Sequence, residues 1–277
     1  MYRLMAGRFE GLTDLEWKLF NDVFPQEPSK RGKGMPHAPY RHILNSLLYI
    51  LITGCRWCDL PRGDMWASKS SSHRWLKRWR TDGTFEHLQA RILAIASEKG
   101  LINWQFGAVD GSFSPVQGGG EEVAYGGKGK EILIHTLTEG NGMPLSNSTT
   151  PANGNEREQV LPLLDKVKLK TLKRGRPRKR LKVLAADKGY DSKEQRTKLR
   201  KRGIRPQIPK RNWKTKKNKG RPIKISVPRF QQERCFAWYQ RKYRRLVVRW
   251  ERRKVYFDAF IDLATIHIWI QRILLVG

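Results

Sequence analysis

Three acidic residues, each in a different sequence setting, most strongly limit how this chain can fold. Asp110 follows the apolar run FGAV, and Asp187 follows LKVLAA. Runs of this length and composition are typical of buried β-strands, so both carboxylates are expected at strand ends. Glu233 instead opens a long segment of helical character, FQQERCFAWYQRKYRRLVVRWERRKVYF. Two acids on strands and one on a helix predict a mixed α/β core.

Three carboxylates placed in this way can hold a pair of divalent metal ions. Mg²⁺ takes oxygen ligands and keeps open positions for phosphate, and Mn²⁺ accepts the same ligands. Asp110 would bridge two Mg²⁺ ions, and Asp187 and Glu233 would each hold one of them. Taken singly, an Asp at a strand end can also be an ordinary turn or cap residue. The order of all three acids is what favours a metal site.

The charge of the chain indicates its partner. Its 277 residues include 56 Lys and Arg against 25 Asp and Glu, which gives a formal net charge of +31. Such a surplus cannot be neutralised within the chain and predicts strong, salt-sensitive attraction to a polyanion. We therefore expect a nucleic acid as the partner, the alternative being a basic surface that is merely solvated.

The cysteines and the apolar C-terminal segment indicate a soluble cytoplasmic protein. Three cysteines cannot form an even disulfide framework, which fits a reducing compartment. Cys55 and Cys58 form a single C-x-x-C without a second half, so no zinc site is expected. Charged residues interrupt FIDLATIHIWIQRILLVG, which favours an amphipathic helix over a membrane span. The start of the chain lacks the continuous apolar core of a signal peptide.

Residues 1–100 are predicted to form a helical DNA-binding domain. LTDLEWKLFNDVF has Thr13 as a candidate N-cap, Glu16 to complete a capping box, and an apolar helical face that begins at Leu15. The next expected helix is HILNSLLYILITG, which ends at Gly54.

A basic helix should follow this apolar helix after a turn rich in Trp, Pro and Gly. The range 70–72 holds three serines that could cap it, and its basic residues include Arg74, Lys77 and Arg78. An apolar helix, a tight turn and a capped basic helix are the layout of a helix-turn-helix, whose second helix enters the major groove. The alternative is a plain helical bundle with a solvated basic face.

Residues 101–277 are predicted to form the α/β part. WQFGAVDGSF, EILIHTLTE and PLSNSTTPA read as strands, and the GNG turn joins the last two as an antiparallel meander. NEREQVLPLLDKV reads as a helix, LKVLAAD as a strand, SKEQRTKLRKRG as a helix and IRPQIP as a strand. Final helices follow, so helices are expected on both sides of the sheet.

Two basic loops, about 168–182 and 210–225, are expected to have little intrinsic order. Each contains Gly-Arg-Pro, and the first carries Arg174 and Arg176. An extended tripeptide of this kind can lie along the narrow minor groove of AT-rich DNA. The alternative is a flexible loop that contacts phosphates without reading sequence.

Several long motifs give the chain a family resemblance. They are LTDLEW, ILNSLLYILITGCRWCDLP, VDGSF, LIHTLTEGNGMPLSNSTTPANGNEREQ, AADKGYDS and RFQQERCFAWYQRKYRRLVVRWER. In this order they resemble the DDE transposases encoded by bacterial insertion sequences, in the group whose prototypes are insertion sequences four and five. The resemblance covers nearly the whole chain.

The resemblance implies a ribonuclease-H-like core in which Asp110, Asp187 and Glu233 form the metal-binding triad. It also implies that the protein nicks transposon ends by metal-dependent hydrolysis, and that the released 3′-hydroxyls then attack target DNA. Bringing two ends together usually requires at least a homodimer in this family. A non-catalytic DNA-binding relative and a structure-selective nuclease on the same fold are the alternatives.

The family pattern also suggests cationic residues around the triad. Arg229 matches an Arg four residues before the glutamate and is assigned to phosphate binding, with Arg234 and Lys188 expected to assist. Fuller signatures in the family have a Tyr and a Lys where this chain has Ser226 and Gln240. The phosphate and flipped-base contacts of those relatives therefore do not transfer to this chain.

Overall fold

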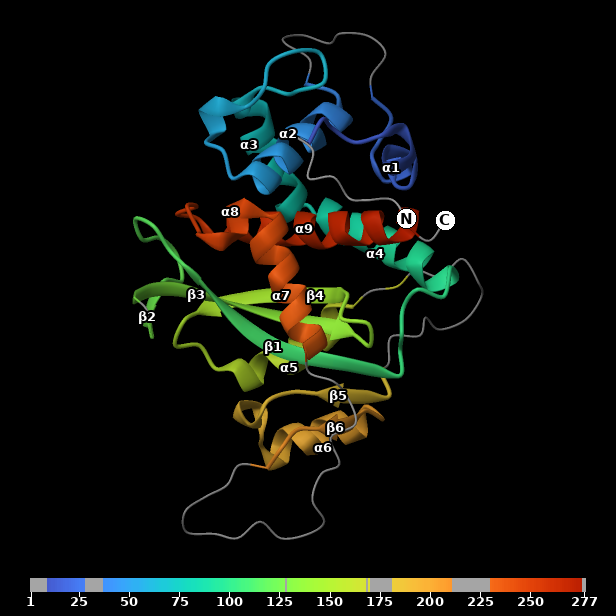
Figure 1. Cartoon of the computed structure of the whole chain (residues 1–277), viewed down its shortest axis with the longest axis vertical. Coiled ribbons are helices and arrows are strands. Elements are labelled where there is room, and N and C mark those ends of the chain that lie inside the picture. Colours follow the sequence, from blue (N-terminus) through green and yellow to red (C-terminus); the bar gives the residue numbers. More distant parts are fainter. Residues whose placement is uncertain are drawn as a thin grey trace.

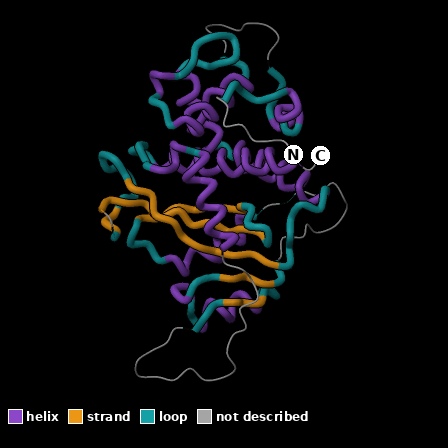
Figure 2. The backbone as a smooth tube through the Cα atoms, in the orientation of Figure 1, coloured by secondary structure: helices purple, strands orange, loops and turns teal. Residues whose placement is uncertain are grey.

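The computed structural model describes residues 9–27, 37–127, 129–167, 169, 181–210 and 230–275. A mixed sheet lies at the centre, the N-terminal helices lie at one end of the molecule, and the strands β5 and β6 lie at the other (Figure 1). In Figure 2 the strands lie in the middle and lower part of the view, below the helix-rich N-terminal end. The mixed α/β class predicted from the sequence is confirmed.

The N-terminal part is helical, as predicted. Its helices are α1 (Asp14–Lys18), α2 (Tyr40–Thr53), α3 (Lys69–Thr81) and α4 (Thr84–Glu98). Short 3₁₀ turns lie at Asn21–Val23 and Trp57–Asp59. α2 ends at Gly54 in the left-handed conformation, with φ of 71°, where a residue with a Cβ would be strained.

The predicted capping box at α1 is confirmed, but the buried face was predicted wrongly. The Glu16 N–H donates to Thr13 Oγ1 at 3.2 Å, and the Thr13 N–H donates to Glu16 Oε2 at 2.8 Å. Leu15 is 69% exposed, whereas Glu16 is buried and accepts a hydrogen bond from Gln271 at 2.6 Å. Because α1 ends at Lys18, it is too short for helical periodicity to choose its face.

The tight turn of a helix-turn-helix was also predicted wrongly. Residues 54–68 separate α2 from α3, and Ser68 caps α3 by accepting from the Ser71 N–H at 3.2 Å. Side chains of α2 hold this long connection: Ser46 Oγ accepts from the Ala67 N–H at 2.8 Å. Asn45 Nδ2 donates to the Met65 carbonyl at 3.1 Å. These buried polar groups fix the connection onto α2, a pattern that hydrophobic periodicity does not reveal.

The sheet has the strand order of a ribonuclease-H-like fold. The strands are β1 (Phe106–Pro115), β2 (Ala124–Gly126), β3 (Gly129–Glu139), β4 (Pro144–Pro151), β5 (Val183–Ala185) and β6 (Arg205–Gln207). β1 pairs with β3 antiparallel on one side and with β5 parallel on the other. β4 pairs with β3 antiparallel, β6 pairs with β5 parallel, and β2 pairs with the start of β3. The predicted meander and the two later strands are confirmed.

Helices cover both faces of the sheet, because neighbouring residues of β4 contact helices on opposite sides. Ser148 donates to Gln159 of α5 (Glu156–Lys166) at 3.1 Å. Asn147, on the other face, donates to Thr265 of α9 (Lys254–Leu275) at 2.8 Å. α7 (Phe230–Lys242) crosses in front of β1 in Figure 1, and α8 (Arg244–Val247) follows it. α6 (Lys193–Lys201) packs against β6.

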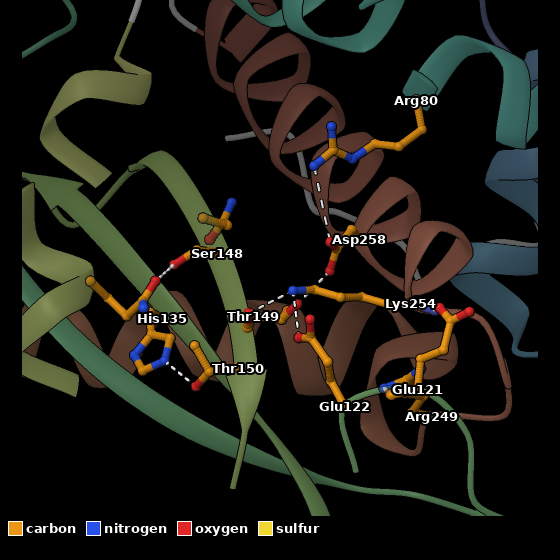
Figure 3. A network of polar contacts seen from close by, with 12 residues as sticks. Arg80, Glu121, Glu122, His135, Ser148, Thr149, Thr150, Arg249, Lys254 and Asp258 are labelled. Atoms are coloured by element: carbon orange, nitrogen blue, oxygen red, sulfur yellow. Dashed lines mark hydrogen bonds and ion pairs between the residues drawn. The ribbon is translucent and has the colours of Figure 1, made fainter. Parts of the chain in front are cut away.

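A polar network joins the N-terminal helices to the sheet through α9 (Figure 3). Arg80 of α3 lies 3.0 Å from Asp262 and 4.0 Å from Asp258, both on α9. Asp258 accepts from Thr149 Oγ1 of β4 at 2.6 Å. Lys254 donates to the Thr149 carbonyl at 2.9 Å. α9 also packs along α4 and α3, so it fixes the helical end of the molecule on the sheet. The division of the chain near residue 100 stays a prediction.

The apolar C-terminal segment forms α9, as predicted, and most of its apolar residues are buried. None of the helices in the described ranges has both the length and the apolar character needed to cross a membrane.

Candidate active site

Strand register brings Asp110 and Asp187 to the same edge of the sheet. Ala108 of β1 pairs with Ala185 of β5 in parallel register, and each aspartate lies two residues further along its chain. Neighbouring strands lie about 4.8 Å apart. The two aspartates therefore lie side by side just beyond the paired part of β1 and β5. Both are partly buried. The prediction that Asp187 follows a strand is confirmed, because β5 ends just before it. The prediction that Asp110 lies at a strand end is wrong, because β1 continues to Pro115.

The start of α7 lies over β3 directly across from Asp110. Thr138 Oγ1 donates to Gln232 Oε1 at 2.7 Å, and Gln232 Nε2 donates to the Thr136 carbonyl at 2.8 Å. Thr136 is the register partner of Asp110. The residue next to Gln232 is Glu233, so its backbone is held over this part of the sheet.

The face of α7 that carries Glu233 points toward β1. Gln240 lies seven residues, close to two helical turns, after Glu233 and therefore on the same face. Its side chain donates to Ser112 Oγ at 3.4 Å. Ser112 and Asp110 share one face of β1, because side chains alternate along a strand. Glu233 is thus on the helix face above the strand of Asp110, and it is exposed.

These three acids do not form a closed cluster. Within the described ranges, no three His, Cys, Asp or Glu side chains lie close enough together to hold one metal ion. The strand register brings Asp110 and Asp187 to the same sheet edge, and Glu233 lies on the facing helix. The metal role of the three acids remains a prediction.

Tyr190 lies three residues after Asp187 and was missed from the sequence. It ends the 3₁₀ turn Lys188–Tyr190, which Asp187 caps, and its side chain is fully buried. Burial raises the pKa of its hydroxyl well above the usual range, and the charges of Glu156, Asp110 and Asp187, with a hydrogen bond to Glu156, add to that shift.

The structure describes only two of the cationic residues that were predicted near the acids and in the first basic loop, Lys188 and Arg234. Lys188 follows Asp187 and is exposed. Arg234 is also exposed, lies over the Trp238 ring at 5.2 Å, and donates to the Asn141 carbonyl in the β3–β4 turn. Arg174, Arg176 and Arg229 lie outside the described residues, as do most of the two basic loops.

The predicted basic face of α3 is present. Arg74, Lys77 and Arg78 are all exposed, at positions that share one side of the helix. Arg78 lies over the Trp75 ring at 4.7 Å, which holds its guanidinium at the surface. The opposite side is buried and includes Trp79. α3 therefore presents a basic face to solvent.

Two proteins of Burkholderia cepacia are similar in sequence. One, named a putative transposase for insertion sequence element IS402, is 41% identical over 129 residues, which are 47% of this chain and 58% of that protein. The other, an insertion element IS402 uncharacterized 16.2 kDa protein, is 29% identical over 114 residues, covering 40% of this chain and 78% of that protein.

Two solved structures resemble the chain distantly. The piggyBac transposase synaptic complex with hairpin DNA aligns with a TM-score of 0.42 and 10% identity, over 95% of this chain and 72% of that chain. The Mos1 strand transfer complex aligns with a TM-score of 0.27 and 10% identity, over 90% and 82%.

Two family models match successive parts of the chain. The family described as putative transposase of the IS4/5 family matches residues 12–89. The family described as transposase DDE domain matches residues 105–268, which include the strands β1 to β6 and the helix that carries Glu233. By this match over more than half of its length, the chain belongs to the DDE transposase family of bacterial insertion sequences.

Proposed function

We propose that this chain is a DNA transposase that cuts insertion-sequence ends and joins them to target DNA. The observation that supports this most is the register of β1 and β5, which aligns Asp110 with Asp187 at one sheet edge. The helix face of Glu233 lies toward the same strand, within the segment that matches the DDE domain. Three acids on these three elements are the arrangement expected for metal-dependent phosphodiester chemistry.

Asp110, Asp187 and Glu233 would hold two Mg²⁺ ions, and Mn²⁺ suits the same ligands. The donor set fits, because all three residues offer the hard oxygen ligands that these cations prefer. When bound, the ions supply charge that stabilises the attacking and leaving oxygens of the scissile phosphate. Glu233 is exposed on the first turn of α7, so its side chain is free of packing that would prevent it from approaching the two aspartates.

Cationic residues near the acids would attract and orient the DNA backbone. Lys188 is exposed next to Asp187, and Arg234 is exposed next to Glu233. Arg229 would contact phosphate, as the family pattern implies. A phosphate that approaches several carboxylates is repelled, and these cations offset that repulsion.

The basic face of α3 would bind the DNA ends at a site away from the three acids, through Arg74, Lys77 and Arg78. Arg174 and Arg176 would add contacts from the first basic loop. Most of this binding energy would come from phosphate contacts and would fall steeply with salt.

In the proposed reaction, hydrolysis at each transposon end leaves a 3′-hydroxyl, and that hydroxyl then attacks the target strand. Two ends must be processed together, so we propose that a homodimer forms in the DNA complex. The proposed location is the bacterial cytoplasm, with association to the nucleoid when the protein is bound to DNA.

Incubation of the purified protein with its own element's end DNA and Mg²⁺ tests this proposal, with Asp110→Ala beside it as the matched variant. The expected result is 3′-hydroxyl breaks at the ends and joined products, both lost in the variant. Tight binding of end DNA without cleavage would favour a non-catalytic DNA-binding relative. Cleavage without joining, at sites unrelated to the ends, would favour a structure-selective nuclease.

A further inference from the structure

Trp250, between α8 and α9, has the most exposed side chain of the described tryptophans. It is 58% exposed, whereas every other tryptophan in the described ranges is buried or half-buried. Both of its neighbours are buried, since Arg249 is 0% and Glu251 is 7% exposed. A single exposed apolar residue is common on protein surfaces. The significance of Trp250 therefore lies in how it is held and in what surrounds it.

The backbone on both sides of Trp250 is fixed to the rest of the fold. The Arg249 N–H donates to the Pro115 carbonyl at 2.8 Å, and the Gln117 N–H donates to the Arg249 carbonyl at 2.9 Å. The Arg249 side chain turns inward and donates to the Glu251 carbonyl at 2.8 Å. The indole is thus presented to solvent from a fixed backbone, so little conformational entropy is lost when it meets a partner.

Exposed arginines lie close to Trp250 in the chain. Arg252 and Arg253 follow it, and Arg244 precedes it in α8. The intervening Glu251 is buried in an ion pair, so its charge is turned away from this surface. Cationic side chains beside a flat aromatic ring are the pattern that binds single-stranded nucleic acid, because the cations bind phosphates and the ring stacks on a base.

The loop between α8 and α9 lies on the path from the candidate active site to α3. Arg249 forms a parallel bridge with Val116, six residues after Asp110. A strand rises about 3.3 Å per residue, so this loop lies about 20 Å from Asp110. At the start of α9, Tyr256 stacks on His73 of α3 with ring centroids 4.2 Å apart. In Figure 1 the loop lies between the sheet and the N-terminal helices. DNA that contacts both the acids and α3 would therefore pass the exposed indole.

We propose that Trp250 stacks on an unpaired base of single-stranded DNA, while Arg252 and Arg253 bind neighbouring phosphates. This role rests on the proposed function, which supplies the DNA. The faces of paired bases are covered by their neighbours in a duplex, so an indole stacks fully only where a base is unpaired or a step is opened. At about 3.4 Å per nucleotide, the contacted base would lie about six nucleotides from the scissile phosphate.

Fluorescence anisotropy with a labelled oligothymidylate in EDTA measures this contact separately from cleavage. Trp250→Ala should bind the oligonucleotide about ten-fold more weakly than the wild type, because one stacked base is lost. Trp250→Phe keeps an aromatic ring and should stay within about three-fold of the wild type. Trp250→Leu is apolar without a ring and should resemble Trp250→Ala. Blunt duplex DNA should bind all four proteins equally.

Two further variants serve as controls for exposure and for charge. Leu275, at the end of α9, is also 58% exposed, and Leu275→Ala should keep wild-type affinity for oligothymidylate. Arg252→Ala should make the plot of log K against log salt less steep by about 0.7, whereas Trp250→Ala should leave its steepness unchanged. All of these side chains are exposed, so urea denaturation should show wild-type stability in each variant.

End DNA that carries one unpaired base, placed at successive positions, tests where the contact falls. The gain in affinity should be greatest about six nucleotides from the cleavage site and should disappear in Trp250→Ala. A gain at no position would overturn the proposed contact.

The outcomes separate this role from the proposed function. Equal oligothymidylate affinity in the wild type and Trp250→Ala would overturn the role of Trp250, even in a protein that cuts and joins transposon ends. An equal loss of single-stranded and duplex binding in Trp250→Ala would overturn stacking on an unpaired base. Normal cleavage by Asp110→Ala, with the Trp250 effects intact, would overturn only the catalytic assignment.

Discussion

The Gln232 side chain is bonded to Thr138 in the interior, with Thr138 Oγ1 donating to Gln232 Oε1 at 2.7 Å. Gln232 is 2% exposed and Thr138 is fully buried. A second bond from Gln232 Nε2 to the Thr136 carbonyl, at 2.8 Å, fixes the helix along β3 as well. This pair determines where α7 begins relative to β1, and therefore where Glu233 can reach.

Replacing Gln232 by Ala should both destabilise the protein and reduce DNA cleavage. The change removes both buried hydrogen bonds of Gln232 to β3, worth about 0.5–1.5 kcal/mol each. The first turn of α7 would also lose its anchor, so cleavage should fall more than the folded fraction does. Urea denaturation and single-turnover cleavage measure the two effects.

Gln240→Ala is the matched control for this prediction. Gln240 is exposed and its single contact to Ser112 is long, at 3.4 Å. Its loss should change the free energy of unfolding by less than about 0.5 kcal/mol. Equal loss of stability in the two variants would contradict the anchoring role of Gln232.

Removing charge from the basic face of α3 should weaken DNA binding in a salt-dependent manner. Affinity for DNA falls with salt, and each phosphate contact that is lost makes the plot of log K against log salt less steep by about 0.9. A triple variant is expected to show a plot of log K against log salt that is less steep by about 2–3. Its changes are Arg74→Ala, Lys77→Ala and Arg78→Ala. Fluorescence anisotropy at several salt concentrations measures this slope.

Lys198 on α6 provides a matched loss of surface charge. It is exposed and pairs with Glu194 of the same helix. Lys198→Ala should leave the slope of log K against log salt within about 0.5 of the wild-type value. The reason is that α6 and α3 lie at opposite ends of the molecule (Figure 1). If the α3 variant and this control show the same slope, the basic face of α3 is not the DNA-binding surface.

The buried ion pair of Arg245 and Glu251 should be costly to break from one side. Their atoms approach to 2.7 Å, and the two side chains are 8% and 4% exposed. Arg245 also donates to the Cys55 carbonyl at 3.2 Å, which ties α8 to the N-terminal part. Arg245→Met leaves a buried carboxylate without its cation and should cost about 3–5 kcal/mol of unfolding free energy.

The double variant Arg245→Met, Glu251→Leu tests whether that cost comes from the unpaired charge. It should recover a large part of the stability, because neither charge then remains buried. Urea denaturation of the wild type and both variants gives the comparison. A double variant as unstable as the single one would indicate that packing, and not charge, carries the effect.

Acid should destabilise the protein through buried histidines. Burial, with the charge of Lys242, lowers the pKa of His267 to about 3, and burial with Lys254 lowers that of His135 to about 4. In the unfolded chain a histidine takes up a proton near pH 6.5. Between about pH 6.5 and these lower values the unfolded state binds more protons, so stability is present above pH 6.5 and is lost as the pH falls.

His267→Gln isolates the contribution of one of these histidines. Each buried histidine adds a slope of up to about 1.4 kcal/mol per pH unit to the unfolding free energy. The variant should therefore lose stability less steeply than the wild type between pH 6 and pH 4, measured by urea denaturation at each pH. Parallel curves for the two proteins would contradict the linkage.

Features with a local signal could be predicted from the sequence. The Thr13 capping box, the Gly54 helix end and the β3–β4 turn each depend on a few neighbouring residues with strong preferences. The motifs around Asp110 and Asp187 indicated strands, and apolar composition was sufficient for that. The ribonuclease-H-like core was expected from the family resemblance alone.

Features set by long-range polar contacts could not be predicted. The connection between α2 and α3 depends on Ser46 and Asn45, and the burial of Glu16 depends on Gln271, 255 residues away. Nothing in a local window tells that Gln232 or Tyr190 is buried beside the candidate site. The length of β1 beyond Asp110 likewise depends on its pairing with β3, not on its own composition.

The central claim is that Asp110, Asp187 and Glu233 hold the metal ions of a DNA-cutting site. A structure of the protein with end DNA and Mn²⁺, with the ions located by their anomalous scattering, tests this most directly. The account predicts Mn²⁺ within about 2.2 Å of oxygens from all three carboxylates, with Glu233 drawn toward the sheet edge. Ions bound elsewhere, or a Glu233 side chain that contacts neither ion, would contradict it.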